Sequence, residues 1–74
     1  MTLAELQQSQ RAKISYLPDN LDLTAQLMEQ GFSLKSEVFM AQKAPFNGPI
    51  AVRLHGTKVS IDANIAKQIG IELV

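Results

Sequence analysis

The side chains of this chain that could do chemistry are few and widely spaced. His55 is the only histidine and there is no cysteine, so no second nitrogen or sulfur ligand can complete a transition-metal site. The acidic residues are scattered, whereas paired-carboxylate catalysis needs two acids in one pocket. The serines lack a nucleophile-elbow context, and the isolated glycines form no phosphate-binding loop. We therefore predict no catalytic residue, no metal site and no cofactor.

The length and the charge of the chain narrow the possible classes of protein further. The 74 residues, 46% of them hydrophobic, predict one domain over residues 1–74. Seven basic and seven acidic residues give zero net charge, whereas nucleic-acid binding requires a clustered excess of Lys and Arg. The N-terminus lacks the features of a secretion signal, and no apolar run approaches the ~20 residues of a membrane span. We expect a cytoplasmic protein that binds no nucleic acid and does not insert into the membrane.

The hydrophobic periodicity predicts a mainly β protein. Alternation with a period of two residues is typical of half-buried strands. In the first such segment Ala12, Ile14 and Tyr16 alternate with polar residues, and we expect all three in the core. The predicted strands cover residues 12–16, 37–44, 50–55, 59–61 and 69–73.

Helices and turns complete the predicted architecture. The spacing of Leu23 and Leu27 predicts a helix over 21–30 that ends at Gly31, with Phe32 folding back onto the core. Asp62 caps a short helix over 63–68, and Gly56-Thr57 fits a two-residue hairpin turn. These elements predict a small SH3-like barrel of about five strands, with one inserted helix and a short helical turn before the last strand.

The loop between strands 37–44 and 50–55 is the most informative segment. Its two prolines restrict the backbone on either side of Phe46, and a stiff loop loses little entropy on docking. An aromatic anchor on such a loop often contributes about 2 kcal/mol or more to binding. Two readings stay open, since Phe46 either anchors a partner or folds over the barrel and caps the core. The residues predicted to bind a partner are Pro45, Phe46, Asn47, Gly48 and Pro49.

Helix 21–30 offers a second surface through Leu21, Met28 and Gln30. Leu and Met at helical spacing usually face the core of a protein. We therefore expect this side of the helix to pack inward.

Several segments together resemble the FeoA family. They are Leu27-Met28-Glu29-Gln30-Gly31-Phe32, Ala44-Pro45-Phe46-Asn47-Gly48-Pro49-Ile50, Val59-Ser60-Ile61, and Ala66 with Ile69-Gly70-Ile71. The resemblance covers nearly the whole chain, and the loop with two prolines around a glycine is its most specific part. The chain departs from the usual family pattern at Ser9, Gln26, Leu34-Lys35 and Asp62.

The resemblance implies an SH3-like barrel with a non-catalytic role. It implies an accessory protein of bacterial ferrous iron uptake that binds the cytoplasmic GTP-binding domain of the membrane transporter FeoB. A stand-alone regulatory module, similar to the C-terminal domain of metal-dependent transcriptional repressors, is the alternative. The implied location is the inner face of the cytoplasmic membrane, reached through the partner, and weak self-association stays open.

Overall fold

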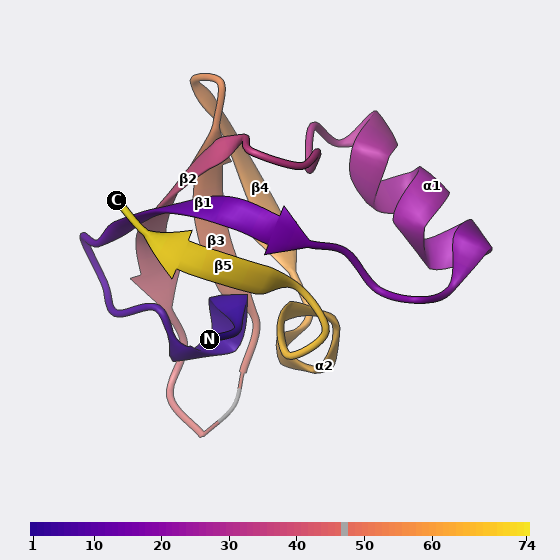
Figure 1. Cartoon of the computed structure of the whole chain (residues 1–74). Helices are drawn as coiled ribbons and strands as arrows, with labels where there is room; N and C mark the ends of the chain where they lie inside the picture. Colours follow the sequence, from indigo (N-terminus) through magenta and orange to yellow (C-terminus); the bar gives the residue numbers. More distant parts are fainter. Residues whose placement is uncertain (47) are drawn as a thin grey trace.

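The computed structural model describes residues 1–46 and 48–74. In this part of the chain a 3-10 turn at Leu3–Glu5 precedes five strands and two helices (Figure 1). Their bounds are β1 Arg11–Tyr16, α1 Leu21–Glu29, β2 Glu37–Lys43, β3 Ile50–Leu54, β4 Thr57–Ile61, α2 Ala63–Ala66 and β5 Gly70–Leu73. The predicted number and order of these elements are confirmed.

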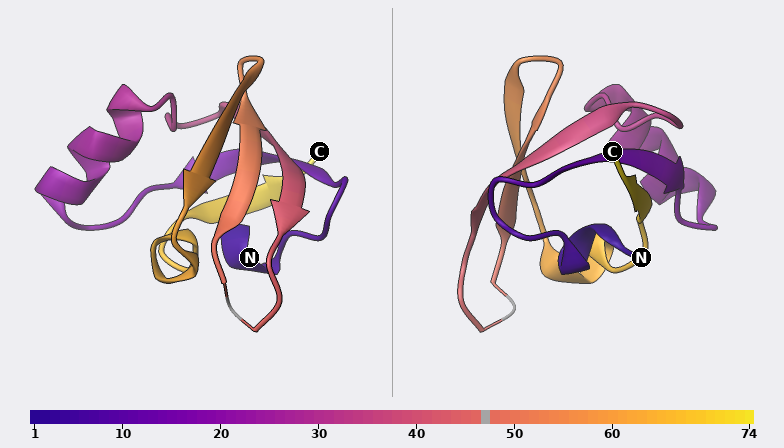
Figure 2. Two further views of the ribbon diagram at one scale, coloured as in Figure 1. Left: turned by 180° about the vertical axis from the view of Figure 1, so that it is seen from behind. Right: turned by 60° about the vertical axis from the view of Figure 1, so that its left-hand side comes forward.

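The strands form one antiparallel sheet in the order β4-β3-β2-β1-β5. The sheet curls strongly, and α2 lies in the connection between its two end strands (Figure 2). The N-terminal segment covers the free edge of β5, where Thr2 bridges Gly70 and the Ile71 N–H donates to the Met1 carbonyl at 2.9 Å. Backbone groups that an edge strand would leave unpaired are thereby satisfied.

The core lies inside the curled sheet. Side chains alternate between the two faces of a strand, and the inward residues Val38 and Met40 of β2 face Val52 and Leu54 of β3. Phe32, which follows α1, is fully buried as predicted. Among the described residues no polar or charged side chain is buried, so apolar burial drives the packing of the core.

The end of β1 departs from the predicted alternation. Ala12 and Ile14 are buried, but Tyr16 is 51% exposed. The register of β1 on β5 shifts between Ile14 and Tyr16, which turns Tyr16 out of the core. Its ring lies against Gly70, its register partner, where a Cβ would overlap the ring. The prediction that Tyr16 packs in the core was wrong because the alternation of residue types carries no mark of this shift.

The β3–β4 hairpin turns one residue earlier than predicted. Leu54 pairs with Thr57, so the two-residue turn is His55-Gly56 and not Gly56-Thr57. Both residues have positive φ, 51° at His55 and 81° at Gly56, as a type I′ turn requires. Histidine is uncommon at the first of these positions, which is why the pattern points to the wrong pair.

Side-chain caps mark the start of both helices. The Asn20 carboxamide accepts from the Leu23 N–H at 3.1 Å, and the Asp62 carboxylate accepts from the Asn64 N–H at 2.8 Å. Gly31, with φ of 107°, follows α1 as predicted, whereas α2 ends at Ala66 and is shorter than the predicted 63–68. No helix of the described residues has the length and apolar character needed to cross a membrane.

The contact between Tyr16 and Gly70 yields a stability prediction. Gly70→Ala places a methyl group where the ring lies, so the free energy of unfolding should fall by about 1–2 kcal/mol in urea denaturation. In a Tyr16→Ala background the same substitution should cost much less, because the ring is gone. An equal cost in both backgrounds would show that the ring does not set the requirement for glycine.

The His55-Gly56 turn yields a second stability prediction. Asparagine tolerates the left-handed region better than histidine, so His55→Asn should raise the free energy of unfolding by about 0.5–1 kcal/mol. His55→Ala is the matched control, because it removes the imidazole and keeps the unfavourable φ. The interpretation fails if the two variants are equally stable.

Candidate partner-binding loop

The predicted docking segment joins β2 to β3 and projects beyond the sheet (Figure 1). The Ala44 N–H donates to the Pro49 carbonyl at 3.2 Å and closes the loop. Inside it the Gly48 N–H donates to the Pro45 carbonyl at 3.1 Å, the hydrogen bond of a tight turn. Asn47 lies outside the described residues. The backbone around Phe46 is therefore tied down on both sides.

Phe46 is the most exposed large apolar side chain in the described part of the chain, at 99%. The reading in which it caps the core is therefore wrong. Its φ is 57°, a region that costs a bulky residue about 1–3 kcal/mol and that clusters at ligand contacts. Phe46 therefore exposes its aromatic ring to solvent, and its backbone adopts a conformation that phenylalanine disfavours.

The base of the loop is fixed to the N-terminal segment. The Lys43 ammonium donates to the Ala4 carbonyl at 3.0 Å, and Ala4 lies in the 3-10 turn next to the fully buried Leu3. At Gly48 a Cβ would lie 2.7 Å from the Ala44 Cβ, so the turn closes tightly only with glycine there. The loop thus projects from a rigid support, which favours docking without large ordering losses.

Two shallow hollows of about 220 Å³ each flank the base of the loop. One is lined by Gln42, Pro49 and Ser60 among others, and the second by Ala4, Lys43 and Lys67 among others. A partner surface that contacts Phe46 therefore meets a mostly apolar hollow on one side and two ammonium groups on the other.

His55 lies at the β3–β4 turn, at the opposite end of β3 from this loop. Its ring is close to Gly31, where an added Cβ would lie 3.6 Å from the His55 Cδ2 atom. Within residues 1–46 and 48–74, no three His, Asp or Glu side chains gather closely enough to hold a metal ion.

Helix α1 contradicts the expectation that its side with Leu21, Met28 and Gln30 packs inward. Leu21 is 89% and Met28 is 55% exposed, Gln30 is exposed, and Leu27 is the one buried residue of the helix. The helix stands away from the sheet (Figure 1). Helical spacing alone does not reveal this, because it places Leu21 and Met28 on one face without saying what that face contacts.

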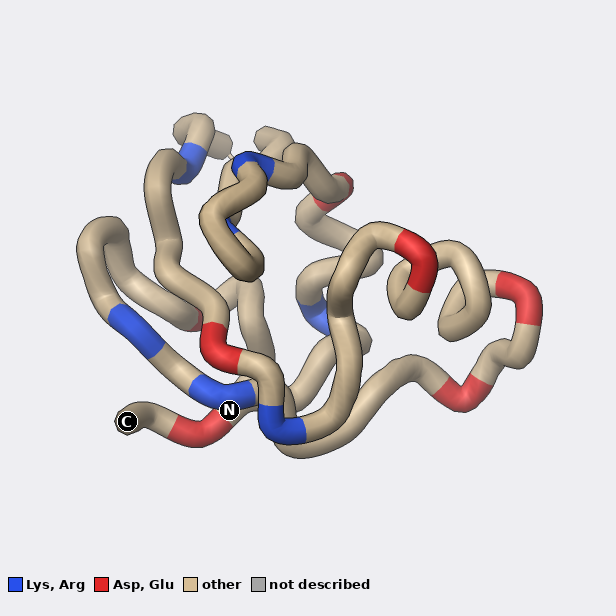
Figure 3. The backbone as a smooth tube through the Cα atoms, turned by 90° about the horizontal axis from the view of Figure 1, so that it is seen from above, with Lys and Arg blue, Asp and Glu red and all other residues tan. Residues whose placement is uncertain are grey.

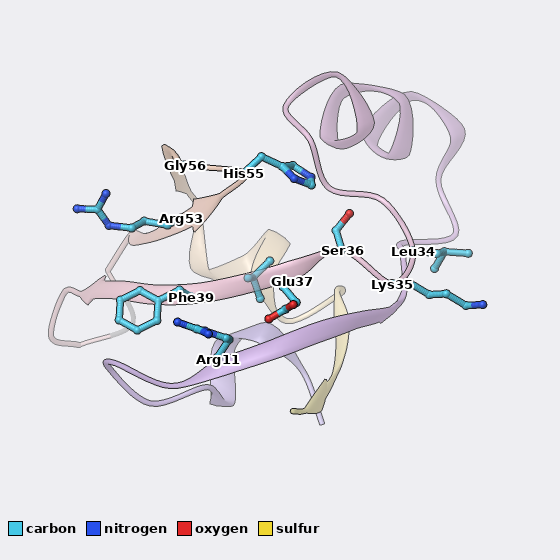
Figure 4. Close-up of a pocket in the computed structure, with 10 residues that line it drawn as sticks. Arg11, Leu34, Lys35, Ser36, Glu37, Phe39, Arg53, His55 and Gly56 are labelled. Carbon is cyan, nitrogen blue, oxygen red and sulfur yellow. The ribbon is translucent and has the colours of Figure 1, made fainter.

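A larger groove of about 750 Å³ lies on the outer face of the sheet, between β1, β2, β3 and the loop after α1 (Figure 4). Arg11, Phe39 and Arg53 line it, each from a different strand. The sequence-based prediction missed this groove, because only the strand register brings these residues together.

The fold resembles solved structures of FeoA proteins and of a repressor. FeoA from Chlorobium tepidum is 24% identical, with a TM-score of 0.92 over 100% of this chain and 70% of that one. A manganese-dependent transcriptional repressor is 16% identical, with a TM-score of 0.90 over 100% of this chain and 41% of that one. At these identities the likeness shows the fold alone. By sequence, no curated protein matches the chain.

FeoA from Stenotrophomonas maltophilia, solved in complex with zinc, is more similar to this chain in sequence. It is 28% identical, with a TM-score of 0.81 over 97% of this chain and 89% of that one. It is described as a prokaryotic SH3 domain protein and a candidate activating factor for bacterial ferrous iron transport. The predicted SH3-like fold is thereby confirmed. Because the sequence pattern of the FeoA domain matches residues 1–73, the chain belongs to the FeoA family.

Proposed function

We propose that residues 1–74 act as one non-catalytic accessory module of bacterial ferrous iron uptake. Family membership supports this role, as does the description of the Stenotrophomonas maltophilia protein as a candidate activating factor for ferrous iron transport. A module of this kind acts by contact, so a rigid exposed anchor matters more than a reactive side chain.

The proposed partner is the cytoplasmic GTP-binding domain of the transporter FeoB, which holds the module at the inner face of the membrane. The proposed contact is made by Pro45, Phe46, Asn47, Gly48 and Pro49. The observation that carries this proposal is the Phe46 ring, 99% exposed on a loop anchored through Lys43. Burial of a phenylalanine side chain stabilises by about 1.5–3 kcal/mol, enough to dominate a small interface.

A regulatory module like that of metal-dependent repressors is the alternative function. The likeness to the manganese-dependent repressor supports it through the fold alone. No side chain of this chain favours it over contact with a transporter.

The binding role of Phe46 has a direct test. Phe46→Ala should weaken binding to the isolated GTP-binding domain about 30-fold, the equivalent of 2 kcal/mol, in isothermal titration calorimetry. Leu73→Ala is the matched control, because Leu73 is an exposed apolar residue at the end of β5. Equal affinities of wild type and Phe46→Ala would refute the loop as the contact.

The strained φ of Phe46 predicts a trade between stability and binding. Phe46→Gly relieves the unfavourable backbone region, although glycine gains freedom in the unfolded chain. The free energy of unfolding should therefore stay equal or rise by up to about 1 kcal/mol, while binding is lost as in Phe46→Ala. A clear loss of stability would show that the ring supports the fold.

A further inference from the structure

A line of cations crosses the outer face of the sheet. Arg11 is the register partner of Phe39, Phe39 of Arg53, and Arg53 of Lys58. Strands lie about 4.8 Å apart, so the Arg11 and Arg53 backbones lie roughly 10 Å apart with Phe39 between them. Figure 4 shows the Arg11 guanidinium beside the Phe39 ring, an arrangement that suits a cation–π contact. We call these three residues, the two arginines Arg11 and Arg53 with Phe39 between them, the cationic row.

The nearby acids offset only part of the charge of the cationic row. Glu37 and Glu72 are both register partners of Lys13, one on each side of it, so Lys13 offsets one of these two negative charges. The remaining negative charge lies at the groove, which Glu37 lines, and it offsets only one of the two arginines. Arg53 has a second cation, Lys58, as its other neighbour. Leu34 adds an apolar side chain, 58% exposed, at the rim of the groove. The groove therefore suits a partner surface with acidic groups around an apolar centre.

The zero net charge of the chain hides a separation of charge. Residues 14–34 contain three acids and no Lys or Arg, so the rest of the chain carries a net charge of +3. Figure 3 shows the acidic positions on α1 and the loop before it at one end of the molecule, and most of the basic positions over the sheet. The chain thus carries an acidic region whose charge is complementary to that of its own groove.

Helix α1 holds the matching surface. Ala25 lies three or four residues from Leu21, Asp22, Met28 and Glu29, so these side chains surround it on one side of the helix. All five residues are exposed. We call them the α1 patch. A helix of this length is marginal without packing, and Leu27 is its one buried residue, so α1 has much to gain from a second contact.

We propose that the α1 patch of one copy docks on the cationic row of a second copy, with Glu29 opposite Arg53 and Asp22 opposite Arg11. Asp22 and Glu29 are seven residues apart, which on a helix is about 10.5 Å and close to the roughly 10 Å between Arg11 and Arg53. The small Ala25 then faces the Phe39 ring, while Leu21 and Met28 cover the apolar rim. Two copies related by a two-fold axis would make this contact twice, once with each α1 patch.

The size of the patches predicts a weak association. One short helix in an open groove buries less than the ~1,200 Å² of a standard interface. The contact also depends on exposed charges, which salt screens because the Debye length falls from about 10 Å at 0.1 M to 3 Å at 1 M. Self-association should therefore be concentration-dependent and weaken about tenfold on a change from low to high salt.

Charge reversal in the full-length protein tests the contact in sedimentation equilibrium. Arg53→Glu and Glu29→Lys should each weaken self-association about tenfold, because each places like charges opposite one another. Neither change should harm the fold, since Glu at 53 faces Lys58 and Lys at 29 suits the end of a helix. Lys67→Glu is an exposed charge-matched control outside both patches and should associate like wild type.

A mixture of the two variants gives the sharpest result. In the mixed pair the reversed groove faces the reversed helix, and the unchanged groove faces the unchanged helix, so wild-type affinity should return. A wild-type protein that stays monomeric up to millimolar concentration overturns the proposal. So does a mixture that associates no better than its components, or a control as disruptive as Arg53→Glu. The transporter contact of Phe46 is unaffected by any of these outcomes.

Discussion

The pairing of β2 with β3 is the constraint on which both surfaces of this protein depend. It sets Met40 opposite Val52 in the core and Phe39 opposite Arg53 outside. A slip of one residue would exchange the two faces, so the buried apolar positions enforce the register. The same hairpin ends in the loop that presents Phe46. Core packing, the outer groove and the exposed ring are therefore three results of one strand pairing.

Much of the fold could be predicted from local signals. The alternation around Val52, the cap Asp62 and the glycine after α1 each act within a few residues, and each was predicted correctly. The failures involve structure set by distant contacts. The outward turn of Tyr16 depends on its register with β5, and a residue pattern carries no record of a register shift.

The surfaces were harder to predict than the core, for a physical reason. The sequence locates the loop from Pro45 to Pro49, because prolines and glycine mark it, but the exposure of Phe46 depends on what surrounds the loop in space. The row of Arg11, Phe39 and Arg53 joins residues that are far apart in the chain. A zero net charge, read from composition, likewise gives no sign that acids and bases lie on different parts of the molecule.

The proposed docking element of this family member is a rigid loop that carries an exposed aromatic ring. Its most direct test is nuclear magnetic resonance of the isotope-labelled protein during titration with the GTP-binding domain of FeoB. We expect the strongest perturbations of amide signals between Ala44 and Ile50. Binding that perturbs other surfaces and leaves this loop unchanged would contradict it.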